Sequence, residues 1–293
     1  MLSICIPVYN VKVEKLVEAL LVQASGINIP YEILVIDDCS AIDIADANAK
    51  LEGITYLGLK ENIGRARIRN MLVKSAKYDH VLFLDCDSEV VSSVFLKNYV
   101  SEIGKHEKVV CGGRVYNEQE PAKDKLLHWK YGKNQESRPA SERMINPYQS
   151  FMTNNFLIEK KVLETIPFDE RLSGYGHEDT LLGYQLKKNK IPVKHIDNPI
   201  LHAELESNAE FIKKTECGVS NLKRILEYVN YDKAFIEDVM LVRYYTTLKK
   251  YGLLFLIKGT FVLTRPLIKS LLTKGSTSLT LFNFYKLGCL VTN

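Results

Sequence analysis

The sequence has 293 residues, of which 46% are hydrophobic and 25% charged, and its formal net charge is +4. This composition is typical of a globular protein, with room for one large α/β domain and an appendage. The six cysteines form no CxxC pair, so we expect reduced packing cysteines in a cytosolic setting rather than a disulfide framework or a zinc site. The first residues, MLSICIPVYN, lack the pattern of a signal peptide and are typical of a core strand.

The charge is unevenly distributed along the chain. Residues 239–293 contain eight Lys and Arg but no Asp or Glu, whereas residues 1–238 contain 31 basic and 35 acidic side chains. A nucleic-acid binder would instead carry its basic residues as a patch on the folded domain, so we expect no nucleic-acid partner. A mildly acidic body with a basic, apolar end fits contact with an anionic membrane surface.

The N-terminal third alternates strands and helices. The pattern predicts strands at 2–9, 31–38, 53–59 and 80–85, with helices at 13–25, 45–52 and 64–76 between them. Near-continuous apolar strands separated by helices indicate a parallel sheet that is covered on both faces. In such sheets, ligands bind beyond the carboxyl ends of the strands.

The remaining elements are less regular. We expect a strand at 109–116, a loop at 138–149, a strand running into a helix at 154–166, and a last strand at 192–203 that ends at His202. Helices are predicted at 209–229 and 234–252, followed by an apolar tail. There is no internal repeat.

Polar residues gather where the predicted strands end. They are Tyr9 and Asn10, Asp37 and Asp38, and Asp85 and Asp87. An Asp at a single strand end is explained by turn formation, but four carboxylates at one edge repel each other unless a cation or a donor-rich ligand neutralises them. An Asp-x-Asp at a strand end can hold Mg²⁺ or Mn²⁺ with positions left for diphosphate oxygens. The absence of GxGxxG after the first strand argues against a dinucleotide-dependent oxidoreductase.

A second acidic pair, Glu178 and Asp179, follows the glycine-containing run GYGHED and opens a predicted helix. One interpretation is helix capping, because acidic residues are favoured in the first helical turn. The other is general base catalysis, in which a carboxylate whose pKa is lowered by the helix N-terminus accepts a proton from a hydroxyl group.

Taken together, these motifs resemble the family-2 glycosyltransferases, which are inverting enzymes with the α/β fold called GT-A. The matching runs are SICIPVYN, EILVIDDCS, ENIGRARIRN, HVLFLDCDSE, NNFLIEKKVLETIPFDE and GYGHEDTLLGYQL, in the order of the family. The resemblance covers residues 1–205 and implies a catalytic domain there, with a nucleotide-binding half at about 1–107 and an acceptor-binding half at about 108–205. Residues 206–293 would form a helical C-terminal extension.

The resemblance also implies roles for individual residues. Asp179 would be the catalytic base, and Glu178 would touch sugar or acceptor hydroxyls. Mn²⁺ or Mg²⁺ would be held by Asp85, Asp87 and His202. The nucleotide-sugar would be bound by Pro7, Tyr9, Asn10, Asp37, Asp38, Asn62, Gly64, Arg65, Asp85, Cys86, Asn155 (or its neighbour Asn154) and Gly176.

The histidine before the acidic pair and the arginines after NIG each allow two interpretations. His177 stands where the family often has an aromatic residue, commonly Trp, and either contacts the acceptor or packs in its loop. On the helix after NIG, one of Arg67 and Arg69 is expected to reach phosphate, with the other solvating the helix.

The resemblance predicts transfer of a sugar from a nucleotide-sugar, with UDP expected, to a hydroxyl of a glycan or lipid-linked glycan acceptor. The alternative is a non-catalytic, sugar-nucleotide-binding partner subunit, against which the intact acidic residues argue. A nucleotidyltransferase would need a Gly-rich, basic loop after the first strand, and PVYNVKVEK is not such a loop.

The tail at 251–273 raises the question of a membrane. Lys258, Arg265, Lys269 and Pro266 interrupt it, and a spanning helix needs about 20 mostly apolar residues. The three basic residues fall on one helical face, as in an interfacial helix. The alternative is a helix packed on the catalytic domain or on a second subunit, as in a homodimer. We expect a cytoplasmic protein, at the inner face of the membrane if the tail binds lipid.

Overall fold

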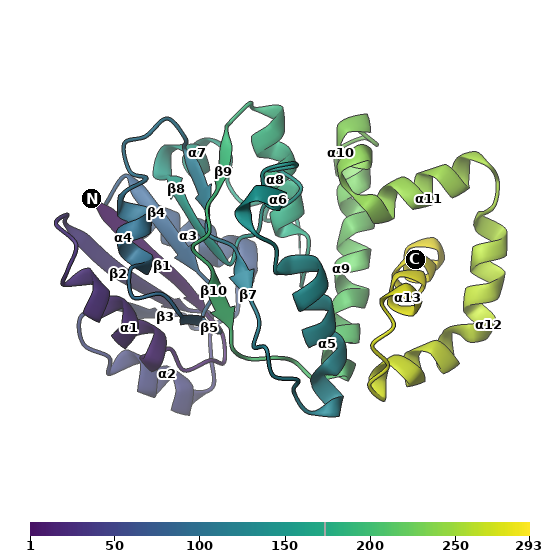
Figure 1. The fold of residues 1–293 in the computed structure, drawn as a ribbon, viewed down its shortest axis with the longest axis horizontal. Helices are drawn as coiled ribbons and strands as arrows, with labels where there is room; N and C mark the ends of the chain where they lie inside the picture. The colour runs from purple at the N-terminus through teal and green to yellow at the C-terminus, as the bar shows by residue number, and fades with distance from the viewer. Residues whose placement is uncertain (173) are drawn as a thin grey trace. The chain divides into compact units, whose positions relative to one another are not determined.

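The computed structural model describes residues 1–172 and 174–293 (Figure 1). The chain divides into two compact units. Unit 1 comprises Met1–Asn117, Glu136–Leu172 and Glu178–Glu204. Unit 2 comprises Glu118–Gln135, Ser173–His177 and Leu205–Asn293.

Unit 1 is built on a seven-stranded sheet with the strand order β3-β2-β1-β4-β8-β6-β9. The strands are β1 (Leu2–Val8), β2 (Tyr31–Asp37), β3 (Thr55–Gly58), β4 (His80–Leu84), β6 (Val109–Cys111), β8 (Asn155–Glu159) and β9 (Val193–His195). All neighbouring pairs are parallel except those of β8, which runs antiparallel to both β4 and β6. The mostly parallel α/β sheet predicted from the sequence is confirmed.

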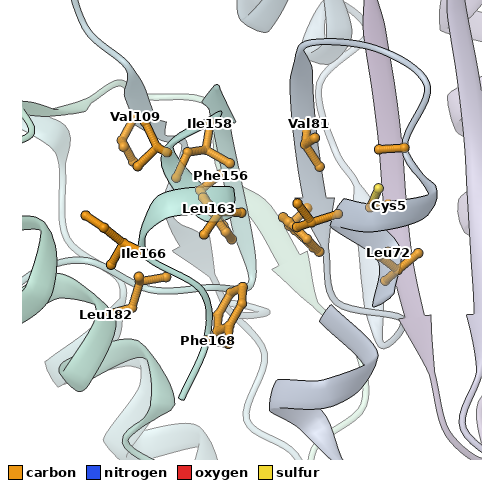
Figure 2. Packing of buried hydrophobic residues seen from close by; sticks show 14 of the residues in the cluster. Cys5, Leu72, Val81, Val109, Phe156, Ile158, Leu163, Ile166, Phe168 and Leu182 are labelled. Atoms are coloured by element: carbon orange, nitrogen blue, oxygen red, sulfur yellow. The ribbon is translucent and has the colours of Figure 1, made fainter. Parts of the chain in front are cut away.

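Hydrophobic layers cover both faces of this sheet, because alternate side chains of a strand point to opposite faces. One layer joins Cys5, Val81 and Phe83 to helices α3, α7 and α8. The other joins Leu2, Ile4, Ile6 and Val8 of β1 and Leu82 of β4 to helices α1 and α4. Figure 2 shows part of the first layer, with Leu163 of α7 beside Phe156 of β8. The helices of unit 1 are α1 (Glu14–Ala24), α2 (Ile42–Ala49), α3 (Arg65–Ser75), α4 (Phe95–Val100), α6 (Ala140–Arg143), α7 (Lys160–Thr165) and α8 (Glu178–Lys188).

A second sheet of three short strands lies in the same unit, in the order β5-β10-β7. The strands are β5 (Ser88–Val90), β7 (Arg114–Val115) and β10 (Ile200–His202). β10 is antiparallel to β5, with His202 opposite Ser88, and parallel to β7. This pairing brings the last predicted strand next to the LDCD turn that follows β4.

Two of the predicted strands are therefore split between the two sheets. The run at 109–116 divides into β6 and β7 at Gly112 and Gly113, and the run at 192–203 divides into β9 and β10 around Asn198. An added Cβ at Gly112 would lie 2.3 Å from both the Asn198 carbonyl oxygen and the Tyr99 hydroxyl, so only glycine fits this crossing. Our expectation of two uninterrupted strands was wrong because the break depends on this long-range contact.

The expected loop at 138–149 contains the short helix α6. Arg143 at its end is buried and donates hydrogen bonds to the carbonyl oxygens of Gly112 and Ile196, at 3.1 and 2.8 Å. The segment is thus fixed to the ends of β6 and β9, where the sequence alone indicated only a polar loop.

Unit 2 is helical, as predicted for the C-terminal extension. Its elements are η1 (Lys123–Lys125), α5 (Leu126–Tyr131), α9 (Asn208–Tyr228), α10 (Lys233–Asp238), α11 (Met240–Lys250), α12 (Leu254–Thr273) and α13 (Leu279–Thr292), with a π-helical turn, η2 (Gly132–Glu136), bridging the two units. The helix predicted at 234–252 is divided at Val239, which has an extended conformation. A capping box between Ser207 and Glu210 starts α9.

The core of unit 2 lies between α5, α9, α12 and α13, and includes Phe261, Phe282 and Tyr285. Gly288 of α13 packs directly on the Phe261 ring, at 2.2 Å from the position of an added Cβ. No single helix among the described residues is long and apolar enough to cross a membrane, and only α11 and α12 together, bent by 118°, pass that test.

Candidate active site

The Asp85 carboxylate is held by two arginines of unit 1. Its Oδ1 accepts a hydrogen bond from Arg69 Nη2 at 2.8 Å, and its Oδ2 accepts one from Arg114 Nη2 at 3.3 Å. Arg114 also pairs with Glu136 at 3.2 Å, and Tyr116 donates a hydrogen bond to the same Glu136. Asp85 thus lies inside a network of alternating charges, which compensates its negative charge within the protein.

Asp87, two residues further on, has a different environment. Its Oδ2 lies 3.4 Å from His202 Nδ1, because β10 pairs with β5 and the Ala203 amide donates to the Asp87 carbonyl oxygen at 3.1 Å. Burial alone would raise the pKa of Asp87, but His202, Arg114 and Arg65 outweigh it and hold the pKa well below its usual range. Asp87 Oδ1 is buried and has no hydrogen-bond partner among the described residues.

Cys86 lies between these two aspartates. Burial and the neighbouring Asp87 and Asp85 carboxylates raise the pKa of its thiol to about 12. The thiol is therefore protonated at neutral pH and is unsuited to act as a nucleophile.

The two acidic residues that open α8 are in contrasting surroundings. Glu178 is buried and forms an ion pair with Arg65 Nε, and Arg69 Nη1 lies 3.9 Å away. Burial opposes ionisation of Glu178, but Arg65 and Arg69 outweigh it and lower the pKa. Asp179 forms no ion pair among the described residues, and burial together with the Glu178 carboxylate raises its pKa to about 6. The expectation that the helix N-terminus lowers the pKa is wrong for Asp179, because these two effects exceed that of the hydrogen bond from the Thr180 amide.

The hydrogen bonding of Asp179 leaves one carboxylate oxygen available. Oδ1 accepts hydrogen bonds from the Thr180 amide at 2.7 Å and the Thr180 hydroxyl at 3.3 Å. Oδ2 accepts none from the part of the chain that the structure describes. A carboxylate with a raised pKa and an unused oxygen is suited to take a proton from a hydroxyl group.

The loop before α3 is fixed by Asp38. This buried side chain accepts hydrogen bonds from the amides of Ile63 and Gly64, at 2.7 and 3.0 Å, and its carbonyl oxygen accepts one from Asn62 at 3.0 Å. Gly64 has φ +86, a conformation that favours glycine, and it directly precedes α3. Asp38 therefore positions the first turn of α3, which carries Arg65.

The neighbouring strand ends are also tied together. Asp37 accepts hydrogen bonds from the Ser40 amide at 2.7 Å and the Tyr56 hydroxyl at 3.2 Å. Asn10 accepts one from the Ala41 amide at 2.9 Å. Tyr9, next to Asn10, is exposed, and Pro7 lies within β1.

These observations agree with the comparisons made with known proteins. The model of Glycosyl transferase family 2 matches residues 3–166. The chain belongs to this family. The resemblance inferred from the motifs is thereby confirmed, and the match includes both strand-end Asp pairs but ends before Glu178, Asp179 and His202.

Individual relatives are distant. A chondroitin synthase of Pasteurella multocida is 26% identical over 266 residues, covering 78% of this chain and 27% of the relative. The chain thus spans about a quarter of the length of that synthase. A mannosyltransferase from Pyrobaculum calidifontis, solved with GDP-Man and Mn²⁺, is 15% identical with a TM-score of 0.61, covering 100% of this chain and 86% of the other.

A second solved structure has the same architecture. Glucosyl-3-phosphoglycerate synthase from Mycobacterium tuberculosis, solved with Mn²⁺, UDP and glucosyl-3-phosphoglycerate, is 14% identical with a TM-score of 0.54, covering 78% of this chain and 79% of the other. At this level of identity the likeness concerns the fold, and it confirms the GT-A architecture expected for this family-2 chain.

The residues around Asp87 fit a divalent cation. The described residues contain no cluster of three or more His, Cys, Asp or Glu side chains that could hold a metal alone. Asp87 and His202 nevertheless supply one buried, unused carboxylate oxygen and one imidazole. Mg²⁺ and Mn²⁺ commonly take few protein ligands and complete their shells with water and substrate phosphates, so this pair suits such a site. Asp85, with both oxygens engaged by arginines, is the weaker candidate for direct ligation.

Of the two adjacent asparagines, Asn155 is part of the fold. Its amide donates to the carbonyl oxygens of Gly113 and Asn198, both at 2.9 Å, and it accepts from the Tyr99 hydroxyl at 2.6 Å. Asn154 is buried, and neither polar atom of its side chain has a partner among the described residues. Because the Asn154 carbonyl oxygen accepts from the Asp85 amide at 3.0 Å, Asn154 is the better candidate for ligand contact. The assignment of Asn155 stays a prediction.

Gly176 and His177 belong to unit 2. Gly176 has φ +99, and an added Cβ there would lie 3.0 Å from Gly218 Cα on α9. Asn221 donates to the Gly176 carbonyl oxygen at 3.2 Å. The predicted roles of Gly176 and His177 toward sugar or acceptor remain predictions.

Four functional candidates were missed from the sequence: Arg69 as a charge partner, Arg114, Tyr116 and Glu136. The four-residue spacing of Arg65 and Arg69 on one helix could have indicated that both face the same side. Arg114 in β7 and Tyr116 directly after it are two residues apart in an extended run, which is a similar signal. Arg67, in contrast, is exposed and lies 3.6 Å from Glu170, so it fits the expected solvated position.

Proposed function

We propose that the chain is an inverting, metal-dependent glycosyltransferase in which Asp179 is the general base. The observation that carries the proposal is the contrast between two neighbouring carboxyl groups. Glu178 is neutralised by Arg65 and Arg69, whereas Asp179 has no such partner among the described residues, keeps Oδ2 available and has a raised pKa. A base works best when its pKa approaches the working pH, and this environment moves Asp179 in that direction.

The proposed reaction is a single displacement at the anomeric carbon. The acceptor hydroxyl transfers its proton to Asp179 Oδ2 while its oxygen forms a bond to the anomeric carbon. The bond between that carbon and the phosphate oxygen breaks, the nucleoside diphosphate leaves with the electron pair, and the configuration inverts. The ion pairs of Glu178 lower its pKa and so make it a weak base. Proton transfer is therefore assigned to Asp179 and hydroxyl recognition to Glu178.

The metal would be held by Asp87 and His202, with Asp85 acting through the arginine network. A divalent cation at this position supplies charge neutralisation for the diphosphate leaving group. Arg65, which contributes to the lowered pKa of Asp87, lies near enough to add positive charge.

The donor is proposed to be a nucleotide-sugar, with UDP as the expected nucleotide. One solved neighbour binds UDP and the other binds GDP-Man, so the identity of the donor's nucleotide must be tested. The relationship to a chondroitin synthase supports a glycan as acceptor.

Titration calorimetry with UDP and GDP, with and without Mn²⁺, tests the donor and metal assignments. We expect Mn²⁺ to strengthen binding of UDP in the wild type and to have no effect in Asp87→Asn. Glu89→Gln is the matched control, because Glu89 is exposed two residues further along the chain. Unchanged Mn²⁺ dependence in Asp87→Asn would overturn the metal assignment.

Catalysis is tested separately with a sugar-nucleotide panel and product analysis. If release of nucleoside diphosphate requires both an acceptor and Asp179, the result supports catalysis of sugar transfer by this chain. Tight, metal-dependent binding without turnover of any donor would instead favour a non-catalytic sugar-nucleotide-binding subunit.

A further inference from the structure

Helices α11 and α12 carry apolar side chains on the faces that point away from the core of unit 2. In Figure 1 these helices form an angle around α13, against which both pack. Phe261, Ile268 and Leu272 of α12 are buried in that core. Its exposed large side chains are Phe255, Leu256, Val262, Leu263, Leu267 and Leu271, which we call the outer face of α12.

The outer face is continuous along the helix. Leu256, Leu263 and Leu267 follow one another at intervals of seven and four residues, so they form one stripe. Leu263, at its centre, is 83% exposed. Met240 and Tyr244 of α11, together with Tyr251 directly after its end, form a similar exposed stripe. Contiguous exposed apolar surface of this kind marks an interaction site more often than scattered apolar residues do.

The charged residues within these two helices are all positive. Arg243, Lys250 and Lys258 are exposed, and the first two flank the α11 stripe at helical spacing. No Asp or Glu occurs between residue 239 and the end of the sequence. The surface therefore combines apolar side chains with basic ones that have no acidic neighbours along the same helices.

Two of the basic residues of α12 have another role. Arg265 and Lys269 pair with Glu216 of α9, at 3.2 and 3.0 Å, and Tyr285 donates a hydrogen bond to the same carboxylate at 2.5 Å. This arrangement fixes α12 on α9 and so determines which face of α12 points outward. Of the three basic residues expected on one face of this helix, Arg265 and Lys269 thus form ion pairs within unit 2. Lys258 is exposed and pairs with no carboxylate in the described parts of the chain.

We propose that the outer faces of α11 and α12 bind an anionic lipid surface, with both helices lying along it. Apolar side chains would enter the boundary between headgroups and acyl chains, and the flanking Lys and Arg would contact anionic headgroups. A second copy of this chain is a poorer occupant, because a two-fold contact would bring the basic residues of both copies together. The proposal is independent of catalysis, since it concerns no residue of the candidate active site.

The test is co-sedimentation of the full chain with vesicles, without donor. We expect binding to vesicles of equal parts phosphatidylglycerol and phosphatidylcholine, weakened by salt, and little binding to pure phosphatidylcholine. Equal binding to both vesicle types, or none to either, would overturn the proposal.

Two double variants test the two components. Leu263→Glu with Leu267→Glu should lower the partition coefficient at least tenfold, whereas Val22→Glu with Ile42→Glu, which changes exposed apolar residues of unit 1 by the same charge, should not. Lys250→Ser with Lys258→Ser should lower the partition coefficient about 25-fold, because each Lys near an anionic surface strengthens binding about fivefold. Lys12→Ser with Lys15→Ser is the matched control.

Three further measurements distinguish loss of lipid binding from unfolding, from damage to the nucleotide site and from dimerisation. Thermal melting must show that each variant stays folded, as expected for changes at exposed positions. UDP binding, measured by calorimetry, should be unchanged in each variant. A failure of the lipid proposal can therefore be distinguished from a failure of the proposed function. If light scattering shows a wild-type dimer that Leu263→Glu with Leu267→Glu converts to a monomer, the outer face binds a second copy and the lipid proposal is rejected.

Discussion

Arg69 is buried within α3 and donates a hydrogen bond to Asp85 at the end of β4. The same guanidinium lies 3.9 Å from Glu178 at the start of α8. A single side chain therefore links the strand-end aspartate to the acidic pair, and its charge is compensated on both sides. The centroid of the Phe168 ring lies 5.7 Å from the guanidinium carbon of Arg69.

We predict that Arg69→Met lowers the free energy of unfolding by about 3 kcal/mol, because removing one partner of a buried ion pair leaves the other uncompensated. Arg67→Met, on the same helix but 59% exposed, should change it by less than about 1 kcal/mol. Urea denaturation at pH 7 measures both values. Equal midpoints for the two variants would show that Arg69 is not a structural link.

Asp179→Asn should reduce sugar transfer by at least about 10²-fold while donor affinity is kept, because the amide cannot accept the proton. Glu178→Gln should mainly raise KM, since Glu178 is proposed to contact hydroxyl groups. Steady-state kinetics and calorimetry measure these effects. Retention of more than about a tenth of wild-type transfer in Asp179→Asn would exclude general base catalysis at this residue.

The pH profile provides an independent test of the same residue. The base role proposed for Asp179 requires its ionised form, and its pKa is raised to about 6. Transfer by the wild type should therefore fall as the pH drops below about 6, under conditions of saturating donor and Mn²⁺. A flat profile between pH 5 and about 7 would contradict the assignment.

The raised pKa of Asp179 also predicts a stability change. The pKa of Asp179 is about 6 in the folded protein, against an ordinary value of 3.8, so the folded state binds this proton more tightly than the unfolded state does. The resulting contribution to the free energy of unfolding is present at low pH and is lost as the pH rises through about 6. Asp179→Asn should therefore raise the free energy of unfolding at pH 7 by about 1–3 kcal/mol and leave it unchanged near pH 4. Denaturation at both pH values checks this.

Asp87→Asn should have the opposite effect. The pKa of Asp87 is lowered in the folded protein, so its contribution is present above the ordinary pKa and is lost as the pH falls below it. The variant should be less stable than wild type at pH 7, and the difference should shrink toward pH 2. These measurements need a chelator, since a bound cation would stabilise only the wild type.

The two asparagines should separate stability from ligand binding. Asn155→Ala removes the side-chain donor of the Asn198 carbonyl oxygen and one of the two donors of the Gly113 carbonyl oxygen, and we expect a loss of about 2–3 kcal/mol in the free energy of unfolding. Asn154→Ala removes an amide that has no partner among the described residues, so it should cost less than about 1 kcal/mol but weaken UDP binding. Denaturation and calorimetry on both variants give the comparison, and the reverse ranking would refute it.

The sequence predicted the sheet well because its strands are defined by local apolar runs. Strands β1, β2 and β4 and the carboxylates after them follow directly from period and composition. The strands around Gly112 and Asn198 could not be divided in advance, because the reason for the break is a contact between residues distant in sequence.

Charge partners were the hardest feature to predict. The run NIGRARIRN indicates a helix with three arginines, but it does not indicate which of them is buried against the aspartate that follows β4. In the same way, the sequence predicted that Arg265 and Lys269 lie on a basic face of the helix, but not that both pair with Glu216 of α9. Helical spacing gives the face of a residue, whereas its partner depends on tertiary packing.

The pairing of β5 with β10 has a consequence for the order of events during synthesis. Asp87 is made early, but His202 reaches it only when residues 200–202 join the small sheet beside Ser88–Val90. Contacts between segments so distant in sequence form slowly, because a long loop must close first. We therefore expect nascent chains stalled before residue 200 to contain folded β1–β4 without high-affinity Mn²⁺ binding, so that metal capture marks the completion of unit 1.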